Sequence, residues 1–186
     1  MANLMDAVAG LNDPFARHGL TILRGTGLRL GELLDLELDC LLDFASHGSW
    51  LKVPLGKLGT ERTVPLDQTT LAALDGWTSQ RGAQRALPHP RNGEPTDILF
   101  VERGRRLSAY RLRRGLSDAV TAADLRGRDG AALHVTPHQL RHTYGTSLKV
   151  RWNVVAGTHG AARTRHRRDD PTLRLPRLPN RARRYD

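Results

Sequence analysis

The chain has 186 residues, a length that suffices for one domain with a buried core. Its hydrophobic fraction of 39% is ordinary for a soluble globular protein, and no apolar run is long enough to span a membrane, which excludes a membrane-spanning protein. A single cysteine, Cys40, excludes an intrachain disulfide, and without a recognisable signal peptide this predicts a protein of the reducing cytoplasm.

The formal net charge of +10 is unevenly distributed along the chain. Residues 151–186 hold ten Arg, no Lys and three Asp, which gives this segment +7 and leaves +3 for residues 1–150. Positive side chains neutralise phosphates and so favour nucleic-acid partners. Because residues 1–150 are only mildly basic, their charge alone does not identify DNA as the partner.

Cap and turn residues predict alternating helices and short strands. Asp13 before Pro14 is a strong helix start, since Asp accepts from free amides and Pro fits the first helical position. Thr136 and Gln139 have the spacing of a capping box. The predicted elements, in chain order, are a helix from Pro14 that stops at Gly25-Thr26-Gly27, a helix from about Leu28, strands over 50–54 and 62–66, a helix over 69–80, a loop over 82–97, a strand over 98–101, a helix after Ser108 and a helix from Thr136 to about Leu148.

Three separated motifs supply cations that can surround one phosphate. They are Gly27-Leu28-Arg29-Leu30-Gly31-Glu32, Gly56-Lys57-Leu58-Gly59-Thr60-Glu61-Arg62-Thr63-Val64-Pro65-Leu66 and His138-Gln139-Leu140-Arg141-His142. Arg suits this task because its planar fork meets two oxygens and stays charged. A turn Lys can protonate a leaving oxygen, and His138 and Arg141, three apart on one helical face, can reach the same phosphate.

The order and spacing of these motifs resemble the tyrosine recombinases, also called phage integrases, over residues 14–148. By this resemblance, Glu32 is an acid that helps to position the site, and His142 has a structural or supporting role. The residues implied to be catalytic are Arg29, Lys57, His138 and Arg141.

The same resemblance implies a helix-rich α+β catalytic domain with a small three-stranded antiparallel sheet. It implies DNA integration and site-specific recombination, with double-stranded DNA as the partner and self-association on that DNA. No metal, nucleotide cofactor, small-molecule substrate or membrane partner is expected.

Each fragment also has a simpler interpretation. Arg29 with Glu32 can be an ordinary surface ion pair, and Lys57 a solvated turn lysine. His138 and His142, four residues apart, have a spacing that two metal ligands on a helix can use. No Glu follows the first His and no Cys pair is present, so a zinc site is disfavoured.

The chain departs from the family pattern at both ends. Only about thirteen residues precede the first predicted helix, so we expect residues 1–150 to be a partial catalytic domain without the family's N-terminal core-binding domain. Residues 151–186 are expected to be a disordered Arg/Pro-rich tail. The family's nucleophilic tyrosine follows the His-x-x-Arg arginine by about thirty residues. No tyrosine stands there, and Tyr185 is forty-four residues beyond Arg141.

A shift of reading frame accounts for this tail. The codons of Trp152 and Asn153, read one base later, permit Gly-Met, and the following codons permit Ser-Leu-Gln-Ala-Leu-Met-Ala-Leu-Leu-Gly-His-Val. That series is typical of an integrase continuation, with a histidine codon at position 164 and a tyrosine codon at position 173. We therefore interpret the residues beyond about Lys149 as out of frame.

Three hypotheses follow for the chain as written. An active recombinase would have to recruit Tyr185, which is not in the expected position. A DNA-binding remnant would hold DNA without cutting it, and an inert pseudogene product would do neither. We expect recombinase ancestry with defective catalysis.

Overall fold

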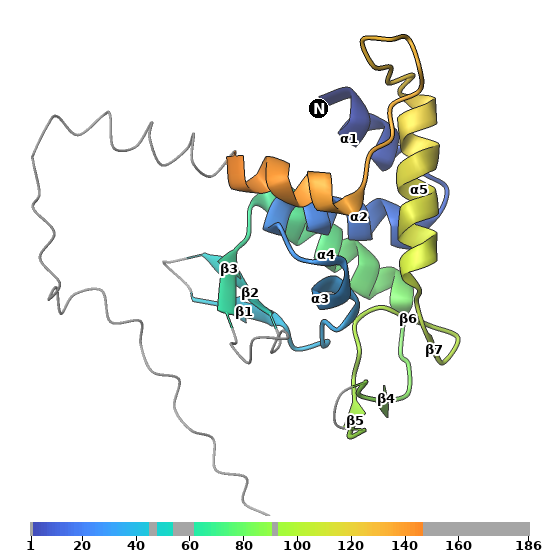
Figure 1. The fold of residues 1–186 in the computed structure, drawn as a ribbon. Helices are drawn as coiled ribbons and strands as arrows, with labels where there is room; N and C mark the ends of the chain where they lie inside the picture. The colour runs from blue at the N-terminus through green and yellow to red at the C-terminus, as the bar shows by residue number, and fades with distance from the viewer. Residues whose placement is uncertain (1, 45–47, 54–61, 91–92, 147–186) are drawn as a thin grey trace, which may run out of the picture. The chain divides into compact units, whose positions relative to one another are not determined.

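A computed structural model describes residues 2–44, 48–53, 62–90 and 93–146 of the chain (Figure 1). Lys57 and the tail predicted for residues 151–186 lie outside the described residues. The described part is mostly helical with a small three-stranded antiparallel sheet, which confirms the predicted fold class. None of its helices combines the length and the apolar character needed to cross a bilayer.

Helices are the largest elements of the domain, and the starts predicted from Asp13 and from the Thr136 capping box are confirmed, whereas the helix predicted from about Leu28 begins at Leu30. Asp13 Oδ1 accepts from the backbone N–H of Phe15 at 3.0 Å, and the Thr136 N–H donates to Gln139 Oε1 at 2.7 Å. The helices are α1 (Ala2–Ala9), α2 (Pro14–Thr26), α3 (Leu30–Leu34), α4 (Gln68–Arg81), α5 (Ala109–Ala122) and a last helix described over residues 137–146.

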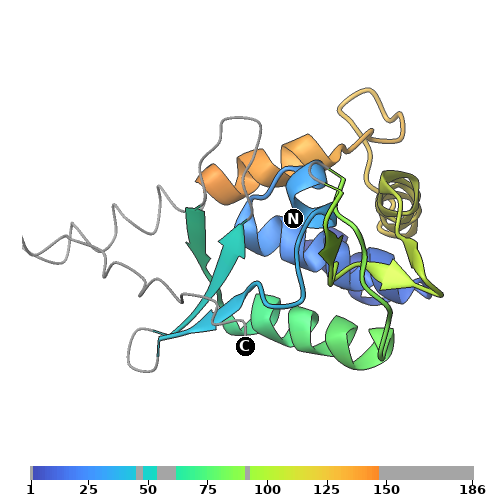
Figure 2. The same ribbon diagram turned by 90° about the horizontal axis from the view of Figure 1, so that it is seen from below.

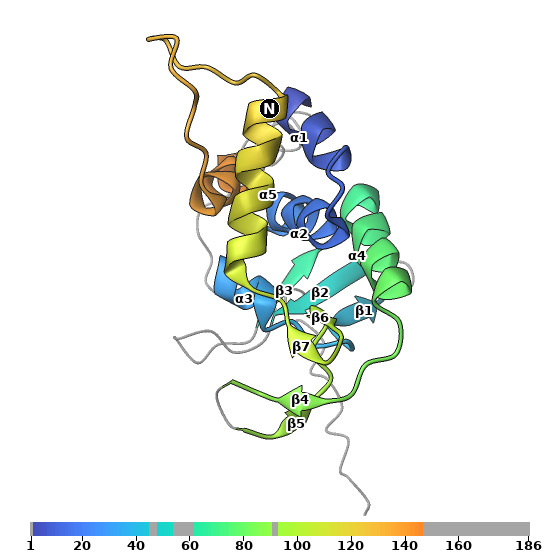
Figure 3. The same cartoon turned by 90° about the vertical axis from the view of Figure 1, so that its right-hand side faces the viewer.

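The central helix is α2, which packs between α4 and α5 (Figure 3). Its Leu20 is fully buried, and glycines on the neighbouring helices permit close approach. A Cβ added at Gly115 of α5 would overlap the Cβ of Ala16, and one added at Gly76 of α4 would lie 2.6 Å from Cε1 of His18. Because these two glycines have no side chain, α4 and α5 can pack closely on α2.

An aromatic cluster joins α2 and α4 to the segment over residues 98–100. The Phe15 ring centroid lies 5.7 Å from that of Trp77 and 5.3 Å from that of Phe100. The indole N–H of Trp77 donates to the Leu99 carbonyl at 2.9 Å, so its polar atom is satisfied inside the core.

The three-stranded sheet lies beside α2 and α4 (Figure 2). Its strands pair in chain order, and Leu51, Val53 and Val64 turn their side chains into the core. The last described residue pair between the second and third strands is Val53 with Arg62. The strands are β1 (Leu41–Asp43), β2 (Ser49–Val53) and β3 (Arg62–Pro65).

Two segments contain structure that the sequence patterns did not predict. The helix α1 buries Leu4 and Val8 and packs on α2 and α5. Eight residues make only about two helical turns, too short a stretch to show a clear helical period. The predicted loop over 82–97 contains a small hairpin of β4 (Leu87–Pro88) and β5 (Pro95–Thr96). Each strand contains a proline, and because proline is rare inside strands the sequence pattern predicted a loop instead.

The predicted strand over 98–101 is wrong in its extent, because Ile98 forms only an isolated antiparallel bridge with Glu37 and Val101 alone belongs to a longer strand. That residue begins β6 (Val101–Glu102), which pairs with β7 (Arg105–Arg106). The backbone before it pairs with the chain after α3, since the Leu99 N–H donates to the Leu36 carbonyl at 2.8 Å. Arg81 adds side-chain hydrogen bonds to the carbonyls of Ile98 and Leu99, both at 3.0 Å. The third strand of the main sheet is β1.

Replacing Gly115 by Ala should destabilise the domain by about 1–3 kcal/mol, because the new methyl meets Ala16 on a rigid helix. Gly145→Ala is the matched control, since no described residue lies within 4 Å of a Cβ at that helical position. It should leave stability unchanged or raise it by about 0.5–1 kcal/mol. Chemical denaturation measures both, and equal stabilities of the two variants would contradict the close packing of α2 on α5.

Candidate functional site

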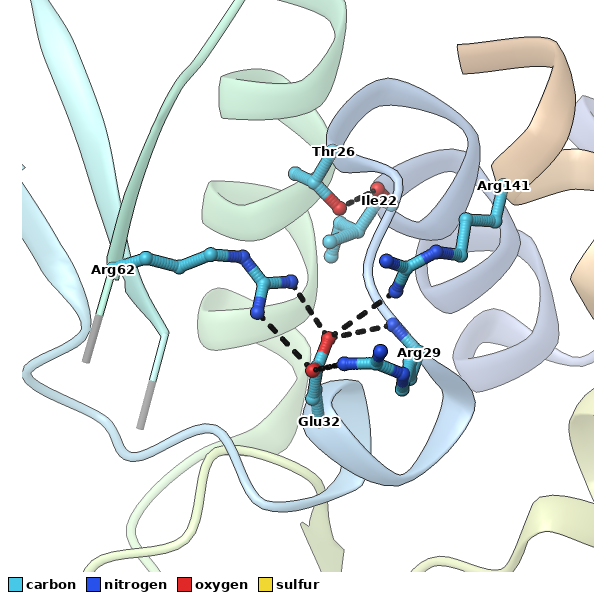
Figure 4. Close-up of polar contacts among 6 residues, drawn as sticks. All are labelled: Ile22, Thr26, Arg29, Glu32, Arg62 and Arg141. Atoms are coloured by element: carbon cyan, nitrogen blue, oxygen red, sulfur yellow. Dashed lines mark hydrogen bonds and ion pairs between the residues drawn. The ribbon is translucent and has the colours of Figure 1, made fainter. Parts of the chain in front are cut away.

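The sequence-predicted residues Arg29, Glu32 and Arg141 come together at the N-terminus of α3 (Figure 4). Arg29 is the residue before α3, and Glu32 lies in its first turn. Arg141 comes from the helix over residues 137–146, more than one hundred residues later. A fourth member, Arg62 at the start of β3, reaches the same carboxylate.

Local structure explains how the two arginine-bearing segments meet. Gly27 ends α2 with φ +62, a left-handed conformation that turns the chain toward Arg29. A Cβ at Gly27 would overlap the ring of Tyr144, so this glycine also lets the helix over residues 137–146 approach the turn. Leu140 on that helix is fully buried, which fixes the rotation of Arg141 next to it.

The carboxylate of Glu32 is the shared partner of the cluster, and its side chain is only 4% exposed. Oε1 accepts from Arg29 Nη1 at 2.8 Å and from Arg62 Nη1 at 3.1 Å. Oε2 accepts from the Arg29 backbone N–H at 2.8 Å and from Arg62 Nη2 at 2.7 Å. Arg29 and Glu32 therefore form more than the simple surface ion pair that their spacing allows.

These contacts determine the charge state of the acid. Burial alone raises the pKa of the Glu32 carboxyl. Hydrogen bonds from Arg62 and from the backbone and side chain of Arg29, together with the charge of Arg62, outweigh burial and lower this pKa to about 2. The group is therefore a carboxylate at any physiological pH.

Arg141 stands apart from this hydrogen-bonded set. Its Nη1 lies 3.7 Å from Glu32 Oε2, which is an ion pair without a hydrogen bond. The same Nη1 atom is buried and has no hydrogen-bond partner among the described residues. Three guanidinium groups face one carboxylate, so two positive charges remain to attract an anion.

A cleft of about 680 Å³ opens beside the cluster. Arg29, His138 and Arg141 line it together with Arg113 from α5, and apolar side chains such as Leu28 complete the lining. The cleft thus presents cationic donors from three elements to one space, as binding of a phosphate requires.

The two predicted histidines lie next to each other on the helix over residues 137–146. Nε2 of His138 is 2.8 Å from Nε2 of His142, and both rings are exposed. In the described part of the chain no group of three or more His, Cys, Asp or Glu side chains is gathered in a way that could hold a metal ion.

Sequence interpretation missed Arg62 as part of this cluster. The available signal was strand alternation: Arg62 and Val64 are two apart on β3, and Val64 is buried, so Arg62 starts on the inward face. An inward guanidinium needs hydrogen-bond acceptors, which a buried acid can supply. Lys57 and Tyr185 lie outside the described residues.

The chain is similar to known proteins both in sequence and in fold. The model of the phage integrase family matches residues 1–151. The chain is 33% identical over 141 residues to tyrosine recombinase XerC of Yersinia pestis, covering 74% of this chain and 41% of that protein. It is 32% identical over 143 residues to XerC of Serratia marcescens, with the same two shares. The chain therefore spans less than half the length of these relatives.

Solved structures show the same fold. A crystal structure of XerA recombinase superposes with a TM-score of 0.57 at 25% identity, covering 81% of this chain and 47% of that one. XerH site-specific recombinase bound to its difH substrate, in a pre-cleavage complex, superposes with a TM-score of 0.60 at 18% identity, covering 86% of this chain and 45% of that chain.

The low pKa of Glu32 predicts an acid-dependent loss of stability. Because the folded carboxyl titrates below its ordinary value of 4.5, its contribution is complete above about pH 5 and disappears as the pH falls toward 2. The loss should be on the order of 2–3 kcal/mol. Glu32→Gln should lower stability at pH 7 and flatten this part of the profile, as measured by urea unfolding at several pH values. An unaltered acid profile in the variant would contradict the assignment.

Proposed function

Because this chain belongs to the phage integrase family of tyrosine recombinases, we propose that residues 1–150 bind double-stranded DNA and hold a backbone phosphate with Arg29 and Arg141. The observation that carries this proposal is the Glu32-centred cluster, which has two more positive charges than negative ones and contributes Arg29 and Arg141 to the lining of a cleft. Fixed guanidinium groups suit the phosphodiester because they also match the charge that builds up in its pentavalent transition state.

The remaining predicted site residues have roles in the same proposal. His138 lines the cleft beside Arg141 and can donate to a non-bridging oxygen. Lys57, by the family resemblance, would protonate the leaving 5′ oxygen. Strand exchange in DNA integration and site-specific recombination is the reaction that such a site serves in a complete enzyme.

We further propose that residues 1–150 are the catalytic domain and that the chain as written does not cut DNA. The family match ends at residue 151, where the out-of-frame segment is expected to begin. Cleavage needs a phenol oxygen held in line with the phosphate. The chain has three tyrosines, and none stands about thirty residues after Arg141. Tyr144 is one turn from that arginine and packs on Gly27.

An inert product is the competing hypothesis, and a gel-shift titration at two salt concentrations separates the two. Binding through phosphates must weaken as salt rises, because counterions released on binding are then more costly to release. A protein without salt-dependent DNA binding would be inert.

Replacing Arg29 or Arg141 with Ala should weaken binding to DNA of any sequence and reduce the slope of log affinity against log salt by about one. Arg106→Ala is the control, since Arg106 pairs with Asp35 and with the Leu34 carbonyl and does not line the cleft. The tail charge is the same in every variant, so differences report the cluster. Unchanged affinity in both cleft variants would remove these residues from the interface.

The chain should form no covalent adduct with nicked suicide DNA substrates on a denaturing gel, because a correctly spaced nucleophile is missing. Tyr185→Phe is the matched variant. An adduct formed by the native chain and lost in Tyr185→Phe would restore the active-enzyme hypothesis.

A further inference from the structure

We propose that Arg62 is a positioning residue that keeps Arg141 free to bind phosphate by saturating the carboxylate of Glu32. This inference rests on the proposed function of the cleft and assigns a role to a residue outside the predicted catalytic set.

Arg62 holds Glu32 in a bidentate arrangement. Its Nη1 and Nη2 donate to the two carboxylate oxygens at 3.1 and 2.7 Å, and the two residues are thirty apart in sequence. This contact ties β3 to α3 and fixes the plane of the carboxylate. Bidentate pairs of this kind are among the stronger and more directional ion pairs between side chains.

The Glu32 oxygens are fully used by this arrangement and by Arg29. Each oxygen accepts two hydrogen bonds, one from Arg62 and one from Arg29. Arg141 is left at 3.7 Å, close enough for attraction but without a hydrogen bond. Its guanidinium is therefore held near the cleft and remains available to another anion.

Arg62 does not itself face the space that a phosphate would occupy. Arg29, His138 and Arg141 line the cleft, whereas Arg62 is absent from its lining. Both Nη atoms of Arg62 are engaged by Glu32. Arg62 therefore affects the cleft indirectly, because it neutralises the carboxylate of Glu32 that would otherwise attract Arg141 more strongly.

Loss of Arg62 should therefore redirect Arg141. With two acceptor positions vacated on Glu32, Arg141 needs to move by less than about 1 Å to donate a hydrogen bond to Oε2. A guanidinium bound in this way would have to break that contact before it could bind DNA. Phosphate affinity then falls even though no phosphate ligand has been removed.

The test is a double-mutant cycle on DNA affinity with the full chain. Arg62→Gln should weaken binding roughly tenfold, as should Arg141→Ala. If Arg62 acts through Arg141, the double variant should be no weaker than Arg141→Ala alone. Arg106→Gln is the control, since it breaks another arginine–carboxylate pair outside the cleft and should leave affinity unchanged.

Melting curves establish that each variant is folded at the temperature of the binding assay. If Arg62→Gln is not folded, the same cycle is run with Arg62→Lys, which keeps the charge but cannot occupy both oxygens in one fork. A smaller affinity loss that still vanishes in the Arg141→Ala background would support the proposal.

Two outcomes would overturn it. Additive losses in the double variant would show that Arg62 contacts DNA independently of Arg141. Unchanged affinity on loss of Arg62, while Arg141→Ala still weakens binding, would show that Arg62 is only structural and would leave the phosphate site intact. If Arg141→Ala has no effect either, the proposed function itself fails.

Discussion

The arrangement of the candidate site depends on one buried carboxylate. Glu32 is 4% exposed, and an isolated charge in that position would be strongly unfavourable. It is tolerated because Arg29 and Arg62 donate four hydrogen bonds to it. The acid consequently fixes the α3 turn and the start of β3 relative to each other, and it attracts Arg141 from the helix over residues 137–146. Segments far apart in sequence meet around a single group.

The helical core holds that group in place. The helix α2 is anchored by α4 and α5 at glycine-mediated crossings, and it ends at Gly27, directly before Arg29. Near this end, Thr26 is buried and donates its hydroxyl to the Ile22 carbonyl at 2.6 Å (Figure 4). Tyr144 packs on Gly27 from the other side. Close packing at the end of α2 therefore sets the separation of the two cleft arginines, since packed interiors transmit small displacements.

Local chemistry made part of this structure predictable. Asp13 and the capping box of Thr136 and Gln139 gave helix starts that the structure confirms, because caps depend on residues close in sequence. The order and spacing of Arg29, Glu32 and Arg141 resemble the motifs of a known family, and that resemblance indicated a shared site. Strand alternation places Arg62 on the inward face of β3, but its pairing with Glu32 depends on a contact across thirty residues, which no local pattern encodes. The segment at 98–100 was predicted as part of a strand, but its backbone pairing is limited to an isolated bridge at Ile98, and the side chain of Arg81 binds the carbonyls of Ile98 and Leu99.

The ionisation of Glu32 tests the central claim most directly. Carbon-13 NMR of the Glu32 side-chain carboxyl, followed from pH 7 to the lowest pH at which the protein stays folded, reports its protonation without reference to DNA. A carboxyl that remains ionised throughout, with a pKa of about 2, is the predicted result. Titration near the ordinary value of 4.5 would show that the arginines do not converge on this acid, and the proposed phosphate site would lose its organising contact.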